Sequence, residues 1–428
     1  MSSACATAPG WRPLVTGGAR DVVLGALRDL VAGLSRPDRI EPRADLAGGD
    51  PGLALLFGAL AAGPAPAPID CDARALARAY LDRAIEEIAR RRMPPALYSG
   101  WLGTAWVAQH LADDLFRPGG DPCGALVPIL AGQVERGADG AHHDLTTGLA
   151  GAAVFALERG DRPSLAILER ITRALGRSAI ATAAGLTWRT APRDLAPHAR
   201  ARYPHGCFNV GVAHGVPGVC AVLAQAEAAG VPGAGSLRRG ATAWLLAQAQ
   251  PEEVGSALPS YFAPGEPPRC SRLAWCYGDA GAAAALATAA RAAGDDDLLA
   301  GALAIGRRAA AREPTRCGVA DAGLCHGSAG LALLFQRLHA ASGDACFARA
   351  ARDWLADTLA RLATGGAPRE PGLLDGRAGV ALCLLAALSP REPTWDAILL
   401  LSPAGAPRAG ARTGAAAAQP SPSPDVPA

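Results

Sequence analysis

The pattern Gly-x-x-Gly followed by an apolar segment occurs seven times along the chain. The second glycines lie 48 to 67 residues apart, which leaves room for one helical hairpin in each repeat. A single pair would mean nothing in a chain with 51 glycines, but seven pairs in register indicate a repeat architecture. The pairs are Gly49/Gly52, Gly100/Gly103, Gly148/Gly151, Gly215/Gly218, Gly278/Gly281, Gly327/Gly330 and Gly376/Gly379.

Two kinds of segment alternate between these glycines. One kind is apolar nearly all round, as in residues 53–57, 152–157 and 331–335, and such helices are buried on all sides. The other kind is amphipathic and rich in Arg, as in 73–92 and 347–362, which is typical of outer helices. Half of the residues are hydrophobic but only 5% are aromatic, so much of the apolar content is helix-favouring Ala. The pattern predicts an all-α fold, an α/α barrel (toroid) of seven inner and seven outer helices over residues 16–402.

Three segments depart from the repeat. The connection over about 175–210 is enlarged, and residues 185–190 within it have the character of a short strand beside a Pro- and Arg-rich loop. We expect a small accessory segment inserted into the barrel there. Residues 403–428 are rich in Pro, Ser, Gly and Ala and are predicted to be a disordered tail, and residues 1–15 a loose N-terminus.

Composition and charge exclude some classes of function. A formal net charge of +2 on 428 residues gives no global field for binding phosphates, so nucleic acid is not expected as a partner. The N-terminus lacks the order of a signal peptide, and every long apolar stretch is interrupted before about 18 residues, so no transmembrane segment is expected. Eleven cysteines without dense pairing favour free thiols and metal ligands over disulfides. We expect a cytoplasmic protein.

Reactive side chains gather at one position of the repeat. Directly before the first glycine stand His214, Tyr277 and His326, and one residue earlier stand Cys276 and Cys325. Equivalent positions in a closed barrel converge on the same rim. Each cysteine alone could be a small buried hydrophobe, but the shared register favours a ligand set of Cys276, Cys325 and His326. Two thiolates and an imidazole suit one Zn²⁺ per chain, with a fourth position open for catalysis.

Other polar residues near the glycines are candidates for the chemistry. His214 lacks a preceding Cys and is a candidate proton donor or acceptor, with a core histidine as the alternative. Asp144 could contribute to the site or serve only as a helix cap or turn residue. Arg272 could orient a carboxylate or enolate oxygen, or be a solvated surface charge. Four more residues have no assigned role: His142 and His143, which could be surface residues or extra ligands, and Cys207 and Cys270.

Three blocks of the sequence, at 212–218, 275–278 and 324–327, resemble the signature blocks of the lanthionine cyclase (LanC-like) family. They read Val-Ala-His-Gly-Val-Pro-Gly, Trp-Cys-Tyr-Gly and Leu-Cys-His-Gly. Residues 203–206, followed by Asn209-Val-Gly-Val, and residues 393–396 look like further blocks of the family. The resemblance covers roughly 50–401 and includes the Asp-x-x-x-Gly register at 144–148.

The resemblance implies roles for the residues already singled out. Cys276, Cys325 and His326 would hold zinc, and His214 would protonate an enolate. The other three candidates, Asp144, Arg272 and Tyr277, would surround the reacting centre. Cys207 departs from the larger side chain expected at its position, so the resemblance does not define the cavity wall near His214.

The function implied is a zinc-dependent lanthionine cyclase, which adds peptide Cys thiols to dehydroalanine or dehydrobutyrine and closes thioether rings. Its partners would be a dehydrated precursor peptide, a separate dehydratase and a transporter in one biosynthetic complex. Two alternatives stay open. The same residues could add glutathione or another small thiol to dehydroamino acids, or the barrel could be a non-catalytic peptide-binding scaffold.

Overall fold

The computed structural model describes residues 10–63, 69–116, 120–137 and 142–405. Helices dominate it, with five short strands in the described part. The α-helices are α1 (Gly17–Leu34), α2 (Asp50–Ala62), α3 (Ala73–Arg90), α4 (Trp101–His110), α5 (Ala112–Leu115), α6 (Leu126–Gly137), α7 (Leu149–Arg159), α8 (Arg162–Ser178), α9 (Pro197–Arg202), α10 (Val216–Ala228), α11 (Ala234–Leu246), α12 (Asp279–Ala293), α13 (Asp296–Ala310), α14 (Ser328–Ser342), α15 (Ala345–Ala363) and α16 (Arg377–Leu388). The strands are β1 (Ile180–Thr182), β2 (Gly185–Thr187), β3 (Arg189–Thr190), β4 (Cys207–Asn209) and β5 (Tyr261–Phe262).

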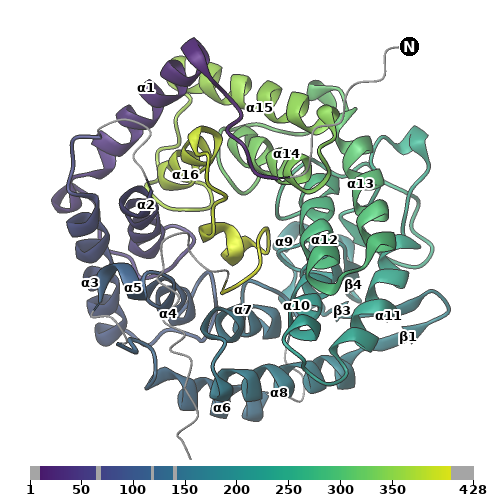
Figure 1. Cartoon of the computed structure of the whole chain (residues 1–428). Coiled ribbons are helices and arrows are strands. Elements are labelled where there is room, and N and C mark those ends of the chain that lie inside the picture. Colours follow the sequence, from purple (N-terminus) through teal and green to yellow (C-terminus); the bar gives the residue numbers. More distant parts are fainter. Residues whose placement is uncertain (1–9, 64–68, 117–119, 138–141, 406–428) are drawn as a thin grey trace, which may run out of the picture.

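The helices form a closed double ring, which Figure 1 shows end-on. Among the described residues, the inner ring consists of α2, α4, α7, α10, α12, α14 and α16, and α16 packs on α2 to close it. The outer ring consists of α1, α3, α6, α8, α11, α13 and α15, each packed on inner neighbours or on the next outer helix. The prediction of an α/α barrel with seven inner and seven outer helices is confirmed.

Inner and outer helices start in different ways. Each inner helix has a glycine as its N-cap and no side-chain cap. Four outer helices instead begin at an aspartate whose carboxylate accepts a backbone N–H of the first turn: Asp72, Asp161, Asp295 and Asp344. The inner helix starts therefore leave their positive dipole ends without a capping side chain, an arrangement that favours anions nearby.

The loops that precede the inner helices join into a ring of backbone hydrogen bonds. Ala47 N donates to Tyr98 O, and the same kind of bond links each loop to the next until Leu373 N donates to Ala47 O. The intermediate bonds are Leu97 N to Thr146 O, Leu145 N to Ala213 O, Ala213 N to Cys276 O, Trp275 N to Cys325 O and Cys325 N to Leu374 O. All seven loops therefore lie at one mouth of the barrel, and their relative positions are set by the backbone.

Glycine is needed where each loop folds back on the helix it starts. A Cβ at Gly330 would lie 1.8 Å from the carbonyl oxygen of Leu324, and one at Gly379 would lie 1.8 Å from that of Leu373. In all seven repeats the second glycine faces the carbonyl six residues earlier, at 1.8–3.3 Å from its ideal Cβ. The glycines of the sequence pattern thus permit this close approach of backbones.

We expect Gly330→Ala to lower the free energy of unfolding by about 3 kcal/mol, because the backbone must shift to remove the clash. Gly25→Ala is the matched control, since Gly25 is also helical, has no atom within 4 Å of its Cβ position and should gain up to about 1 kcal/mol. Denaturant unfolding of both variants measures the difference. Equal stability of the two would contradict the close-approach argument.

The accessory segment is made of two small sheets, one of them built from two connections. Strands β1 and β2 form a hairpin, while β3, β4 and β5 form a three-stranded antiparallel sheet. Strands β1 to β4 lie within the expected insertion at about 175–210, which also contains α9. Strand β5 comes from the connection between α11 and α12, which the sequence pattern had not marked as a strand.

Both ends of the described chain pack against the barrel. Residues 10–15 fall within the expected loose N-terminus, yet Leu14 is buried and its N–H donates to Ala387 O. The segment after α16 crosses the centre of the ring, drawn in yellow in Figure 1, and its carbonyls accept bonds from Tyr98 and Trp275. Residues 1–9 and 406–428, which hold most of the two predicted loose ends, lie outside the described residues. None of the described helices is long and apolar enough to cross a membrane.

Candidate functional site

The candidate residues lie in neighbouring loops of the hydrogen-bonded mouth. Asp144 precedes α7, His214 precedes α10, Cys276 precedes α12, and Cys325 and His326 precede α14. Because each loop is bonded to the next, residues far apart in the sequence come together at the rim. The structure thus brings together the residues that the repeat register had grouped.

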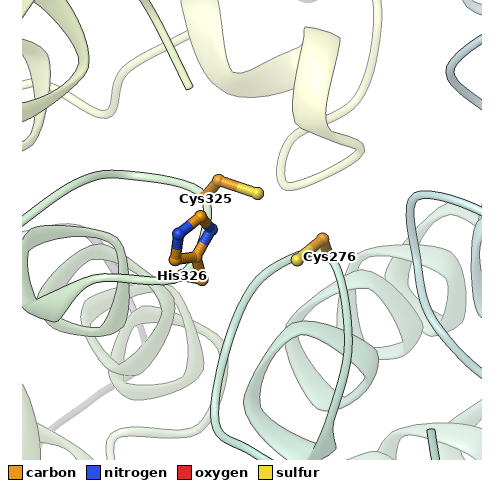
Figure 2. A group of neighbouring side chains, drawn as sticks. All are labelled: Cys276, Cys325 and His326. Atoms are coloured by element: carbon orange, nitrogen blue, oxygen red, sulfur yellow. The ribbon is translucent and has the colours of Figure 1, made fainter. Parts of the chain in front are cut away.

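Cys276, Cys325 and His326 form a cluster with the donor set of a zinc site. Their ligand atoms all lie within 4.8 Å of one another, and this is the one such group of His, Cys and acidic side chains among the described residues (Figure 2). Donors bound to one Zn²⁺ at about 2.0–2.3 Å are roughly 3.5–3.8 Å apart, so small side-chain movements suffice. Both cysteines are buried and His326 is half-buried, so the three residues fit zinc by chemistry and by spacing.

The environment of Cys276 favours a thiolate. A hydrogen bond with the Cys325 thiol, together with His326 and the Arg272 guanidinium, lowers the pKa of Cys276 well below its usual range in spite of burial. Arg272 Nη2 donates to Cys276 Sγ at 3.6 Å. Arg272 therefore lies at the cluster, not in solvent away from the site.

His214 and Asp144 form a pair beside this cluster. His214 Nδ1 lies 2.8 Å from Asp144 Oδ2, and the His214 side chain is 35% exposed whereas that of Asp144 is 4% exposed. Burial raises the pKa of Asp144, but hydrogen bonds from His142 and His214 outweigh it and hold the pKa far below its usual range. The imidazole thus has a buried anion on one nitrogen and an open side at the mouth.

Asp144 also stabilises the turn before Gly148, which was the alternative role for it. Its Oδ1 accepts the Thr147 backbone N–H at 2.8 Å and the Thr147 hydroxyl at 3.1 Å. Asp45, at the same position of the first repeat, accepts Gly48 N–H in the same way. The two interpretations of Asp144 are therefore compatible, because one carboxylate oxygen holds the turn and the other faces His214.

Tyr277 connects the site to the accessory sheet. Its hydroxyl oxygen accepts hydrogen bonds from Asn209 Nδ2 at 3.0 Å and from the Tyr261 hydroxyl at 3.1 Å. Its ring centre lies 5.8 Å from that of His214. Burial, together with Tyr261, raises the pKa of Tyr277, so the phenol stays neutral.

The four unassigned residues lie around the site or away from it. His142 Nδ1 is 3.5 Å from Asp144 Oδ2, and His143 is buried near Trp188, where burial lowers its pKa to about 3. Neither belongs to the metal-ligand cluster of the described residues. Cys207 packs in a small apolar cluster with Leu195, Ala199 and Tyr203, and Cys270 is exposed with its sulfur 3.3 Å from Arg312 Nη2.

Three polar residues at the site were missed by the sequence reasoning. Asp375 directly precedes Gly376, so the register that marked His214, Tyr277 and His326 could have found it. Its Oδ1 lies 3.4 Å from His326 Nδ1. Asp321, 3.3 Å from His326 Nε2, and Asn209 both stand six residues before the first glycine of their repeats, as Arg272 does, so this second repeat position was the signal that could have found them.

Comparisons with known proteins place the chain in a family. No curated protein matches the sequence. A solved structure of a protein titled "Nisin cyclase" is similar in fold with a TM-score of 0.69, at 18% sequence identity, over 89% of this chain and 98% of that one. The sequence profile "Lanthionine synthetase C-like protein" matches residues 42–400. The chain therefore belongs to the family of lanthionine synthetase C-like proteins.

Proposed function

We propose that this protein is a zinc-dependent lanthionine cyclase, which adds Cys thiols of a dehydrated peptide to dehydroalanine or dehydrobutyrine. The observation that carries the proposal is the placement of a Cys-Cys-His cluster and a His–Asp pair at one mouth of a LanC-like barrel. The Cys-Cys-His cluster can bind and activate a thiol, and the His–Asp pair can supply a proton. The addition requires both.

Cys276, Cys325 and His326 would hold one zinc ion per chain. Bound there, the ion would lower the pKa of a substrate thiol from about 8.5, so that the thiol would react as the thiolate at neutral pH. Arg272, with Nη2 at 3.6 Å from Cys276 Sγ, would offset negative charge at this place. The uncapped start of α14, which has no acidic residue in its first turn, adds partial positive charge in the same direction.

His214 would supply the proton that completes the addition. The thiolate forms the new C–S bond at the β-carbon, the electron pair of the C=C bond moves onto the α-carbon and its carbonyl, and the α-carbon then takes a proton. His214 can donate it from the ring nitrogen that does not face Asp144. Asp144 would fix the orientation of the ring and stabilise its cationic form, and Tyr277 would bound the site beside His214.

The two alternative functions differ in whether they need these catalytic residues. A small-thiol adding enzyme would use the same residues on glutathione instead of a peptide thiol. A non-catalytic scaffold would need neither the ligand set nor the His214–Asp144 pair, and the presence of both favours an enzyme. We further propose a dehydrated precursor peptide as substrate, with a dehydratase and a transporter as partners, in the cytoplasm where thiols stay reduced.

A dehydrated, Cys-containing precursor peptide is expected to lose free thiols on incubation with the protein while its mass stays unchanged. Ring closure is an addition within one molecule, so alkylation of the remaining thiols followed by mass spectrometry measures it. The same reaction with glutathione added is the control. A gain of one glutathione mass, with the peptide thiols still free, would support the small-thiol alternative and contradict cyclisation.

A further inference from the structure

The imidazole of His326 lies between two carboxylates, one near each ring nitrogen. Nε2 is 3.3 Å from Asp321 Oδ2, and Nδ1 is 3.4 Å from Asp375 Oδ1. In Figure 2 the nitrogen bonded to the carbon that carries the side chain, Nδ1, lies on the side of Cys276, and Nε2 lies on the opposite side. Asp375 thus contacts the ring nitrogen on the side of the thiols, and Asp321 contacts the nitrogen on the opposite side.

A neutral imidazole can use only one nitrogen as a ligand. It carries one N–H, which donates, and one lone pair, which can bind a metal or accept a hydrogen bond. A carboxylate that accepts the N–H on one side leaves the lone pair on the other side. Asp321 next to Nε2 therefore leaves the lone pair on Nδ1, whereas Asp375 in the same role would turn it away from Cys276.

Asp321 is the better held of the two carboxylates. Its Oδ1 accepts the backbone N–H of Gly323 at 2.7 Å, which fixes the side chain while Oδ2 faces His326. Its side chain is 43% exposed, compared with 61% for Asp375. Among the described residues, no backbone N–H bond to the Asp375 carboxylate matches the one from Gly323 to Asp321.

We propose that Asp321 is a positioning residue for the metal centre: its carboxylate accepts the Nε2–H of His326 and keeps the Nδ1 lone pair directed at Cys276 and Cys325. This inference rests on the proposed zinc site and adds a residue that lies six positions before the first glycine of its repeat. Asp375 contacts Nδ1, the nitrogen that would bind the metal. Metal binding would therefore replace the contact between Asp375 and His326.

The test is the zinc affinity of the purified chain, measured by competition between the apo-protein and a chromophoric chelator with Zn²⁺ alone. Asp321→Ala is expected to weaken zinc binding about 10- to 100-fold, the usual cost of losing such a carboxylate. Asp321→Asn should fall between Asp321→Ala and wild type, because its single amide oxygen can accept only one of the two N–H groups that face Oδ1 and Oδ2 of the carboxylate. Asp375→Ala should stay within about threefold of wild type.

Two controls separate positioning from damage to the loop. Asp45→Ala removes a carboxylate that caps Gly48 N–H in another loop of the mouth, and it should leave zinc affinity unchanged. In a His326→Ala background, Asp321→Ala should cause no further loss, because there is no ring left to orient. An Asp321→Ala variant within threefold of wild type, or an equal loss in Asp375→Ala, would overturn the proposal. A wild-type chain that takes up no zinc would contradict the proposed metal centre as a whole, and this inference with it.

Discussion

The His214→Asn variant is expected to keep its zinc and to lose ring closure by about 10²–10⁴-fold, equivalent to roughly 3–5 kcal/mol of barrier. His214 stands at the same repeat position as His326 but is not part of the metal-ligand cluster of the described residues. Its Nδ1 is bonded to Asp144 at 2.8 Å, so the ring is oriented and can be stabilised as a cation. Asparagine can preserve the contact with Asp144, but it cannot donate a proton to carbon.

Rates would be measured by alkylation of the remaining peptide thiols over time, and zinc by metal analysis of the same samples. His339→Asn is the matched control, because His339 lies near the far end of α14 and its Nδ1 contacts the backbone carbonyl of Asp344. Loss of zinc in His214→Asn would reassign His214 to the metal centre. A rate within about threefold of wild type would make His214 a structural histidine, and the proton donor would then be sought elsewhere, with Tyr277 first.

The sequence allowed the barrel to be predicted because its period is long and its glycines have a packing reason. Gly330 and Gly379 face carbonyl oxygens so closely that no other residue fits without movement, so the pattern marks the start of each inner helix. Apolar helices at these starts must be buried on all sides, and a closed ring is the arrangement that buries them. The local glycine pattern and the apolar character of the helices therefore both predict the closed barrel.

Features that depend on contacts between distant segments were not predictable. Strand β5 is two residues long, and it is a strand because it pairs with β4, some 50 residues away in sequence. Leu14 is held by the end of α16 and the central segment by Tyr98 and Trp275, again over long separations. Periodicity has no signal for pairing of this kind.

The site was predictable to the extent that it follows the repeat. Cys276, Cys325 and His326 share a register, and the ring of loops converts that register into proximity. Asp375 directly precedes Gly376 and so follows the same rule. Asp321 lies six residues before its first glycine, as Asn209 does, and each accepts the backbone N–H of a glycine two residues later, Gly323 and Gly211. Comparison of this second repeat position could have marked Asp321, whose side chain contacts His326.

Replacing both cysteines, Cys276→Ala with Cys325→Ala, is expected to reduce bound zinc from about one ion per chain to almost none, and ring closure with it. The double variant leaves His326 as the sole ligand of the set, and a single imidazole does not hold zinc against the chelators of a purification. Metal analysis of the purified protein measures the occupancy, and far-UV circular dichroism checks that the helices are retained.

The control for this variant is another pair of buried cysteines, Cys220→Ala with Cys383→Ala, which lie within the inner helices α10 and α16. Burial raises the pKa of Cys220 to about 12, and that of Cys383 is also raised, so both are neutral packing groups and not ligands. Their loss should cost stability and leave zinc in place. The opposite pattern, full zinc without Cys276 and Cys325, would mean that the metal is bound elsewhere. The two thiols at the mouth would then be small apolar residues like the control pair, and the activation of a substrate thiol would need another centre.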